Sequence, residues 1–449
     1  MERNKGITLI ALIITIIILL ILAGISLNLL IKGDLFGSAQ KAVNGINEKI
    51  AEQQSIADEL RKEFDENEED GEQKNETGDQ GTKQQETEKQ ETEQQETQEI
   101  LPGTRVTKTT EYKVGDKTAV IPAGFTVSGI STEQSIETGL VIYDIPEGVT
   151  VDWTDPDSVR TTYNQFVWIP VSSVDNFGSS TWEENSETGG EKTLGTVETY
   201  SEPSMKGIDA TTGIESQISE LEISISQYGG FYIGRYEAGS TIARSESSSQ
   251  TEEFVVQQDK YPYVYVEWGN SSSEAVTEGA VYLCNNLYSS TNTNYGATSM
   301  LCTGAAWDST LEFIKDAEHD VTNSITWGMY GSSETYKIYR GSLYAVIING
   351  TSVTTWSAAD KTNGSVACCS LLTTGATERN SSKNIYDIAG NCTEWTTEAV
   401  SKLTNYRVIR GFGNDTDENL STAAAGRSSS LVSSTVDVLS FRPILYVEL

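Results

Sequence analysis

The chain has 449 residues, 37% of them hydrophobic, and it carries 65 acidic against 31 basic side chains, a formal net charge of -34. This length suffices for two or three domains or for one large domain with attachments, and the apolar content can build a core. The acidic excess argues against nucleic acid as a partner, because the summed field repels phosphates. Five cysteines without a CxxC pair are too few for a disulfide framework or a zinc site, although one bridge stays open.

The amino terminus is expected to be a membrane anchor. Arg3 and Lys5 precede an almost wholly apolar run from Ile7 to Ile31, which is longer than the roughly 20 residues that cross a bilayer. The basic residues place the amino end in the cytoplasm, so the rest of a single-pass membrane protein is expected outside the cell. A cleaved secretory signal fits less well, because the apolar run is too long and no small-residue cleavage site closes it.

Residues 1–35 resemble a type IV prepilin leader, with a basic peptide, Gly6 before the expected scissile bond, and the sequence ITLI (7–10) opening a long apolar helix. In pilins a Glu at the fifth mature position takes part in assembly, whereas this chain has Ala11 there. The resemblance therefore implies membrane attachment more strongly than assembly into a pilus. A plain signal anchor without processing stays open.

Two linking segments follow the anchor. Residues 36–64 place apolar side chains at helical spacing and are expected to form an amphipathic stalk, through which chains could oligomerise. Residues 65–100 contain no aromatic residue and no apolar side chain before Ile100. Such a segment cannot bury enough surface to offset chain entropy, so it is expected to be a disordered acidic linker.

A folded region begins near residue 101, where the composition shifts to Val, Ile, Tyr, Trp, Gly, Ser and Thr. Runs of β-branched and aromatic residues bounded by turns predict strands. These runs are 106–112, 118–122, 139–143, 165–171 and 229–239. Apolar residues at helical spacing predict helices over 273–288 and 304–317. We expect 101–159 to form an amino-terminal β-hairpin region and 160–449 to form the main domain.

The stretch from Asn384 to Trp395, NIYDIAGNCTEW, alternates apolar residues with carboxamides and carboxylates around a glycine. A loop of this composition can fix itself in a core while aiming several oxygens at one point, as a hard cation such as Ca²⁺ requires. The alternative is a turn whose Asp and Asn cap the backbone and whose Trp belongs to the core.

Eight short motifs occur in one order over residues 160–449. They are FVWIP (166–170), FYIGRYE (231–237), YVYVEW (263–268), CNNL (284–287), LCTGAAW (301–307), NIYDIAGNCTEW (384–395), RVIRG (407–411) and SFRP (440–443). In this order they resemble the formylglycine-generating enzyme, or sulfatase-modifying factor, domain. The resemblance implies an α+β fold, the irregular C-type lectin-like type, behind the amino-terminal transmembrane helix.

The resemblance also bears on catalysis and metals. The family's enzymes resemble copper oxidases that use two cysteines between the RVxxGG-like strand and the final G-F-R, but residues 412–439 contain no cysteine. Without a soft thiolate pair for Cu(I), copper and formylglycine generation are not expected. The family's calcium loop, carried over by residue, implies Ca²⁺ held by several groups in the Asn384–Trp395 loop. They are the carbonyls of Ala389, Gly390 and Cys392 and the carboxylate of Glu394, with Asn391 in support.

Two functions of different class follow. The first is a non-enzymatic, membrane-tethered adhesion or binding module of a Gram-positive-type cell surface, which takes an extracellular protein or glycan through the small, polar loop 412–439. Its expected ligand-binding residues are Asn414, Asp415, Asp417, Asn419 and Arg427. A variant makes this loop the variable segment of a diversity-generating retroelement protein. The alternative is an oxidase or transferase of the formylglycine-generating superfamily that uses another thiol. The only histidine, His319, and the absence of a GxSxG motif favour no other chemistry.

Overall fold

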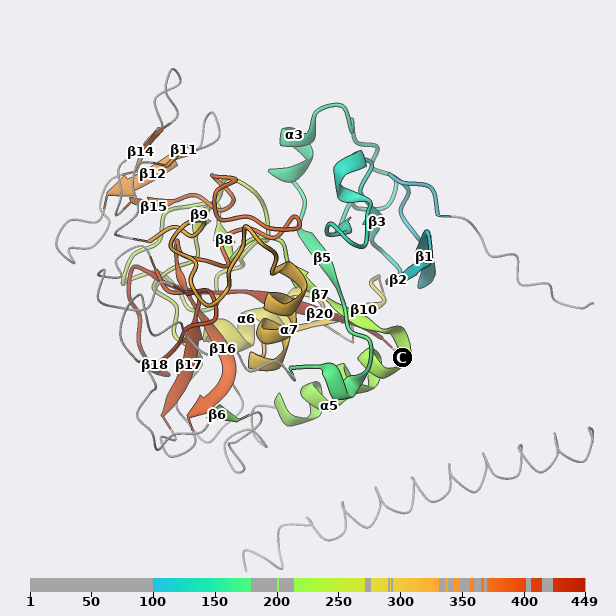
Figure 1. Cartoon of the computed structure of the whole chain (residues 1–449). Coiled ribbons are helices and arrows are strands. Elements are labelled where there is room, and N and C mark those ends of the chain that lie inside the picture. Colours follow the sequence, from blue (N-terminus) through green and yellow to red (C-terminus); the bar gives the residue numbers. More distant parts are fainter. Residues whose placement is uncertain are drawn as a thin grey trace, which may run out of the picture. The chain divides into compact units, whose positions relative to one another are not determined.

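The structure is a computed structural model (Figure 1). It describes residues 100–178, 200–201, 214–270, 276–289, 291, 294–330, 336–337, 343–346, 356–358, 365–366, 370–400, 405–413 and 423–448. These residues belong to one compact unit, Gln95–Leu449. The predicted anchor and stalk, and all of the predicted linker except Ile100, lie outside the described residues. Among the residues that are described, no helix is both long enough and apolar enough to span a membrane.

The described unit is a mixed α/β structure made mostly of sheets, and its largest sheet has six strands in the order β10-β20-β7-β5-β4-β3. All neighbours in this sheet are antiparallel. The strands are β3 (Thr126–Val127), β4 (Val141–Tyr143), β5 (Gln165–Pro170), β7 (Gly230–Gly234), β10 (Ala297–Leu301) and β20 (Pro443–Val447). Strands β7, β10 and β20 are buried along their whole length, which explains the continuous rather than alternating apolar sequences of β7 and β20. The late strand β20 lies inside the sheet, between β10 and β7.

A second sheet carries the carboxyl-terminal motifs in the order β18-β17-β16-β19, and β6 (Tyr200–Ser201) also pairs with β16. Its strands are β16 (Thr393–Val400), β17 (Tyr406–Arg410), β18 (Arg427–Leu431) and β19 (Leu439–Phe441). The pair β16 and β19 is parallel, whereas β16 with β17 and β17 with β18 are antiparallel. Residues 384–395 therefore lead directly into the central strand of this sheet.

Four smaller sheets or ladders complete the strands. They are formed by β1 (Thr110–Val114) with β2 (Lys117–Ile121), β8 (Gly239–Ser240) with β9 (Tyr261–Pro262), β11 (Tyr336–Lys337) with β14 (Ser365–Val366), and β12 (Leu343–Val346) with β13 (Ser357–Ala358) and β15 (Ser370–Leu372). The first of these is the predicted amino-terminal hairpin, which turns at Gly115 with a φ of 64°.

The helices are short and pack on the sheets. They are α3 (Pro156–Arg160), α5 (Ile214–Tyr228), α6 (Gly279–Leu287) and α7 (Gly304–Ile314), with the 3-10 turns η1 (Ser131–Glu133) and η2 (Val174–Asn176). Helix α7 begins where the Thr303 hydroxyl accepts a hydrogen bond of 2.9 Å from the amide of Ala306. Helix α5 packs against β7 and β20, and α6 packs against β10.

The predicted strands near 106–112, 118–122, 139–143, 165–171 and 229–239 appear as β1, β2, β4, β5 and β7, and the two predicted helices appear, shorter, as α6 and α7. Helix α5 was not predicted. The boundary expected between 159 and 160 does not separate two sheets, because β4 pairs with β5, for example Val141 with Val167. The amino-terminal region thus contributes two strands to the main sheet.

Candidate functional site

The loop Asn384–Trp395 is fixed in the core by its apolar residues and by left-handed backbone positions. Ile385, Ile388 and Trp395 are completely buried. Several residues have positive φ, a region that Gly, Asn and Asp adopt most readily: Lys383, Asn384, Asp387, Gly390 and Asn391. The predicted combination of core residues and turn-forming carboxamides is therefore present in one segment.

Gly390 allows this loop to lie directly on the backbone of a distant segment. A Cβ atom at Gly390 would come within 1.9 Å of the carbonyl oxygen of Met329. On either side of it, the Met329 amide donates to the Ala389 carbonyl at 2.8 Å and the Asn391 amide donates to the Met329 carbonyl at 3.1 Å. The glycine is required by this close approach as well as by its φ of 94°.

Asn391 connects the loop to two other elements. Its Oδ1 accepts a hydrogen bond of 2.9 Å from the Leu372 amide, and its Nδ2 donates to the Leu372 carbonyl at 3.1 Å. The same Nδ2 donates to Oε1 of Glu237, which follows β7. Asn391 is thus a buried structural bridge.

Glu394 is completely buried and forms a two-pronged ion pair with Arg442. Arg442 Nη2 donates to Oε1 at 2.6 Å and Arg442 Nε donates to Oε2 at 3.0 Å. The remaining Arg442 nitrogen, Nη1, donates to the Gly234 carbonyl at 2.9 Å. Both carboxylate oxygens are therefore engaged by a cation of the protein itself.

Two of the predicted calcium ligands are already engaged within the protein, Glu394 by Arg442 and the Ala389 carbonyl by Met329. Among the described residues, no group of three or more His, Cys, Asp and Glu side chains is arranged to hold a metal ion. Glu394 does not fit the role of a calcium ligand well, because the Arg442 guanidinium occupies its two oxygens and would repel a second cation. The Ala389 carbonyl already accepts one hydrogen bond from Met329. Calcium binding through Ala389, Gly390, Asn391, Cys392 and Glu394 stays a prediction.

Two further carboxylates lie close to this ion pair, and we call Glu237, Asp387, Glu394 and Arg442 the Arg442 cluster. Asp387 accepts hydrogen bonds from the Gly375 amide at 2.7 Å and from Asn380 Nδ2 at 3.1 Å. Burial raises the pKa of Asp387 to about 6, although Arg442 acts in the opposite direction. Burial, and then the charges of Asp387 and Glu394, raise the pKa of Glu237 well above its usual value. Three acids share one guanidinium, so protonation of Glu237 is favoured.

The predicted ligand-binding loop 412–439 is only partly a loop, because its residues Arg427–Leu431 form β18 and Leu439 begins β19. The part before β18 closes a hairpin between two strands of the second sheet. Arg410 at the end of β17 pairs with Arg427 at the start of β18, so residues 411–426 form the connecting loop. One end of this loop, at Phe412, is buried. The other end is held by Trp307 Nε1, which donates to the Ala424 carbonyl at 3.0 Å, and by the Ala425 amide, which donates to the Val321 carbonyl at 2.9 Å.

Beneath the hairpin lies a network of two acids and two arginines. Arg410 Nη2 donates to Asp308 at 2.7 Å and Arg410 Nη1 donates to Glu398 at 3.4 Å. Arg427 also binds both acids, with Nε at 3.0 Å from Glu398 Oε1 and Nη2 on Asp308 Oδ2. The Arg427 side chain is only 13% exposed. It acts here as a clamp at the base of the loop, where the sequence suggested a direct ligand contact.

The other four predicted ligand-binding residues, Asn414, Asp415, Asp417 and Asn419, lie outside the described residues. The structure adds Asp308, Glu398 and Arg410 to the framework of the hairpin and Arg442 to that of the Asn384–Trp395 loop. The sequence signal that could have indicated these arginines is a charged residue next to apolar residues in a short motif, as for Arg410 in RVIRG and Arg442 in SFRP.

The described thiols are all buried. Cys284, Cys302 and Cys392 have no exposed surface. Burial raises the pKa of Cys284 well above its ordinary value, and burial followed by the nearby Glu237 carboxylate does the same for Cys392. Both effects disfavour the thiolate, which is the form that attacks substrates and binds soft metals.

Comparison with known proteins leaves the family open. No protein-family model matches the chain, and no curated protein matches it significantly. Among solved structures, the crystal structure of CarF is 15% identical, covers 49% of this chain and 87% of that chain, and has a TM-score of 0.28. Treponema denticola variable protein 1 is 10% identical, covers 75% of this chain and 98% of that chain, and has a TM-score of 0.22. Likenesses of this size establish neither the fold type nor a function.

Proposed function

We propose that this chain is a non-catalytic binding module that presents the loop 411–426 to an extracellular protein or glycan, tethered to the cell membrane by its amino-terminal apolar segment. The observation that carries the proposal is the hairpin base, where Arg410 and Arg427 converge on Asp308 and Glu398. Long connections are uncommon in compact domains and are often functional. A rigid framework under such a loop is the usual arrangement of a recognition surface.

Tethering and loop variability are parts of the same proposal. The apolar run 7–31 supplies the anchor, and the acidic linker 65–100 would hold the domain away from the bilayer. A diversity-generating retroelement would exchange residues inside the loop while leaving its base unchanged. A near-identical template repeat beside the gene, differing at adenines, is the expected genomic sign, and its absence would remove this variant of the proposal.

The loop itself can be tested by replacement. In the full-length chain, residues 414–420 would be exchanged for a Gly-Ser segment of equal length, and binding to arrays of extracellular proteins and glycans would be compared with the original chain. We expect the ligand to be lost and the melting temperature to stay within a few degrees, because the hairpin base is retained. Unchanged binding after the exchange would contradict the proposal.

The enzymatic alternative calls for a separate measurement. A sulfatase-motif peptide incubated with the full-length chain and Cu(I) would be examined by mass spectrometry for conversion of its cysteine to formylglycine. We expect no conversion, since the described thiols are buried and residues 412–439 contain no cysteine. Conversion above a protein-free control would favour the oxidase.

Calcium binding, implied by the resemblance, is tested by thermal unfolding in millimolar CaCl₂ against MgCl₂. A cation that binds only the folded state raises the melting temperature. An unchanged curve, together with no heat in calorimetry, would remove calcium from the Asn384–Trp395 loop and leave the Glu394 and Arg442 ion pair as its substitute.

A further inference from the structure

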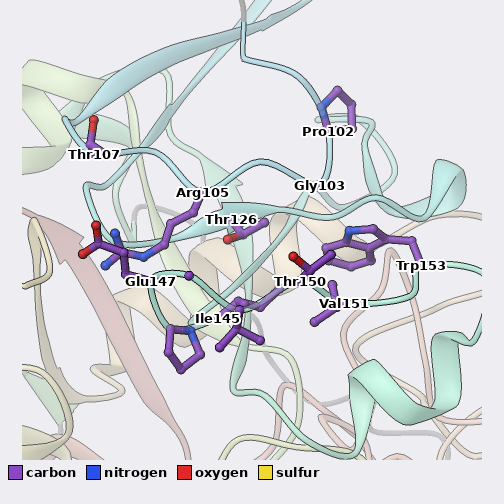
Figure 2. A pocket seen from close by; sticks show the side chains of 13 residues that line it. Pro102, Gly103, Arg105, Thr107, Thr126, Ile145, Glu147, Thr150, Val151 and Trp153 are labelled. Atoms are coloured by element: carbon purple, nitrogen blue, oxygen red, sulfur yellow. The ribbon is translucent and has the colours of Figure 1, made fainter.

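Two features of the described unit could receive a partner. The first is a hollow of about 380 Å³ that is lined by residues of the segments 102–107 and 145–153 (Figure 2). Its lining brings together a cation, an anion and an aromatic ring, from Arg105, Glu147 and Trp153, and this mixture favours no single class of ligand. The second feature is the outer edge of β18, which begins where the loop 411–426 ends.

Strand β18 is an edge strand of the second sheet (Figure 1). Within the described part of the chain it pairs only with β17, in a continuous register without a bulge. Natural edge strands are usually protected by a lysine, a proline or a bulge, and the sequence of β18, RSSSL, contains neither of these residues. Its single charge, on Arg427, is neutralised by Asp308 and Glu398. Nothing on the strand itself therefore opposes the addition of another strand.

The backbone groups of β18 point alternately to β17 and to the open side. Just beyond the strand, the Val432 amide donates to the Asn405 carbonyl at 2.9 Å. Because the hydrogen-bonded pairs of an antiparallel ladder recur at every second residue, Ser428 and Ser430 also direct their amides and carbonyls to β17. Ser429 lies between them and is partly exposed. Its amide and carbonyl are therefore directed away from β17, towards the open side.

An aliphatic surface begins where β18 ends. Leu431 is 43% exposed, and Val436, on the segment that follows the strand, is 44% exposed. The Leu431 carbonyl accepts a hydrogen bond of 2.8 Å from the Ser434 amide, which turns the chain, whereas the Leu431 amide points to the same side as that of Ser429. Leu431 thus offers an added strand a backbone donor and an aliphatic contact.

The chemistry of this edge selects the kind of partner. A polypeptide in extended conformation repeats amide donors and carbonyl acceptors at the spacing of a strand, which a glycan does not. The net charge of -34 on the chain repels an acidic segment and a second copy of the chain, and it attracts a basic segment. The edge therefore favours an extended, basic polypeptide.

We propose that β18 binds an extended, basic segment of a partner protein by strand addition. In an antiparallel arrangement, the partner residue opposite Ser429 accepts from its amide and donates to its carbonyl, and the Leu431 amide donates a third hydrogen bond. This inference rests on the proposed function and narrows its ligand to a protein. The backbone of β18 would hold the partner segment, and the adjoining loop 411–426 would contact its side chains.

The test uses the full-length chain and the synthetic peptide RTVTVTR, which alternates polar and aliphatic residues between basic ends. We expect a Kd of about 1 mM or tighter by fluorescence anisotropy of the labelled peptide. Hydrogen exchange measured by mass spectrometry should show slower exchange in β18 when the peptide is present. The acidic peptide ETVTVTE should bind more weakly, and RTVTVTR with N-methylated amides should not bind, because it has no backbone donors.

Three variants separate the backbone of β18 from its side chains. Ser429→Pro removes the outward amide and keeps the hydrogen bonds to β17, so it should weaken peptide binding at least about fivefold without lowering the melting temperature. Ser429→Ala is the matched control, which keeps the backbone and should bind like the original chain. Ser428→Pro removes an amide that faces β17 and should lower the melting temperature.

The inference is overturned if RTVTVTR does not slow exchange in β18, or if Ser429→Pro binds this peptide like the original chain. A dimer in light scattering that Ser429→Pro dissociates would assign the edge to a second copy of the chain instead. A glycan ligand that the exchange of 414–420 abolishes and Ser429→Pro leaves unchanged would support the proposed function and overturn strand addition. Slower exchange in β18 with RTVTVTR, in a chain whose ligand binding survives the exchange of 414–420, would support strand addition and contradict the role of the loop.

Discussion

Two buried charge clusters meet in one short stretch of chain, because Arg235 belongs to the first and Glu237 to the second. The first, which we call the Glu133 cluster, consists of Glu133, Arg160 and Arg235. The buried Glu133 carboxylate lies 2.8 Å from Arg235 Nη1 and 2.6 Å from Arg160 Nη2. In the Arg442 cluster, three buried carboxylates share one guanidinium. The carboxylates of both clusters are buried, although Arg160 is partly exposed, and the two clusters have opposite ratios of acids to bases.

The difference appears in the pKa values. Burial opposes ionisation of Glu133, but Arg235 and Arg160, with hydrogen bonds from Ser128 and Tyr143, lower its pKa to about 2. In the Arg442 cluster burial prevails, and it raises the pKa of Asp387 to about 6 and also raises that of Glu394. Burial alone therefore does not determine the charge of a carboxyl group. The number of cations within reach decides it.

The largest expected effect comes from removing the only cation of the Arg442 cluster. Arg442→Met leaves Glu394 buried without a counter-ion and should lower the free energy of unfolding by about 4–5 kcal/mol, measured by urea denaturation. The double variant Arg442→Met with Glu394→Leu should recover much of this loss, because no unpaired charge remains. If the unfolding free energy of Arg442→Met alone lay within about 1 kcal/mol of that of the original chain, the ion pair of Glu394 and Arg442 would not be needed for stability.

The next largest effect is expected from Glu133→Gln, which tests the Glu133 cluster. It removes the only acid that the structure places between Arg160 and Arg235, and a loss of about 3 kcal/mol is expected. The loss is smaller than for Arg442 because Arg235 keeps hydrogen bonds to Gln165 and Asn384. Chemical denaturation at neutral pH measures it, and a neutral result would show that the two arginines need no carboxylate.

The pH dependence of stability should have opposite signs in the two clusters. The lowered pKa of Glu133 gives stability that is complete above about 4.5 and is lost as the pH falls towards 2. The raised pKa of Asp387 gives stability that is present at low pH and is lost as the pH rises. Between pH 3.8 and about pH 6, Asp387 keeps its proton in the folded state but loses it in the unfolded state, so stability declines as the pH rises through this window. Asp387→Asn should flatten the unfolding free energy between pH 4 and 6, by roughly 2 kcal/mol, and an unchanged slope would refute the assignment.

The smallest effect is expected from Glu237→Gln, which makes in the Arg442 cluster the same replacement that Glu133→Gln makes in the Glu133 cluster. Because burial and two neighbouring acids already favour the protonated form, the amide resembles the state present at neutral pH. The unfolding free energy should change by less than about 1 kcal/mol. A loss as large as that of Glu133→Gln would mean that Glu237 is ionised, and the contrast between the clusters would fail.

Local patterns in the sequence predicted several elements because the physical cause is local. The hairpin of β1 and β2 follows from alternating strand residues around Gly115, and α7 follows from helical spacing after Thr303. Helix α5 also had such a pattern, with Ile214, Ile218, Leu221 and Ile225 buried along one side, but its many Ser and Glu residues obscured it.

The ionic partners could not be predicted in this way. Arg235 and Glu133 are 102 residues apart in the chain, and Arg410 and Asp308 are also 102 residues apart. Nothing local in the sequence specifies which acid meets which arginine once the sheets have formed. For the same reason the sequence suggested Glu394 as a metal ligand, whereas the fold brings Arg442 to both of its oxygens.

The position of β20 has a consequence for the order of events during folding. Its residues, Pro443–Val447, lie between β10 and β7, so β10 cannot join the main sheet, and β7 can pair only with β5, until this segment has emerged from the ribosome. The pairing of β20 with β7 joins residues more than 200 positions apart. Such distant pairing is slow. Closure of the main sheet is therefore expected to be a late step, with the amino-terminal hairpin formed well before it.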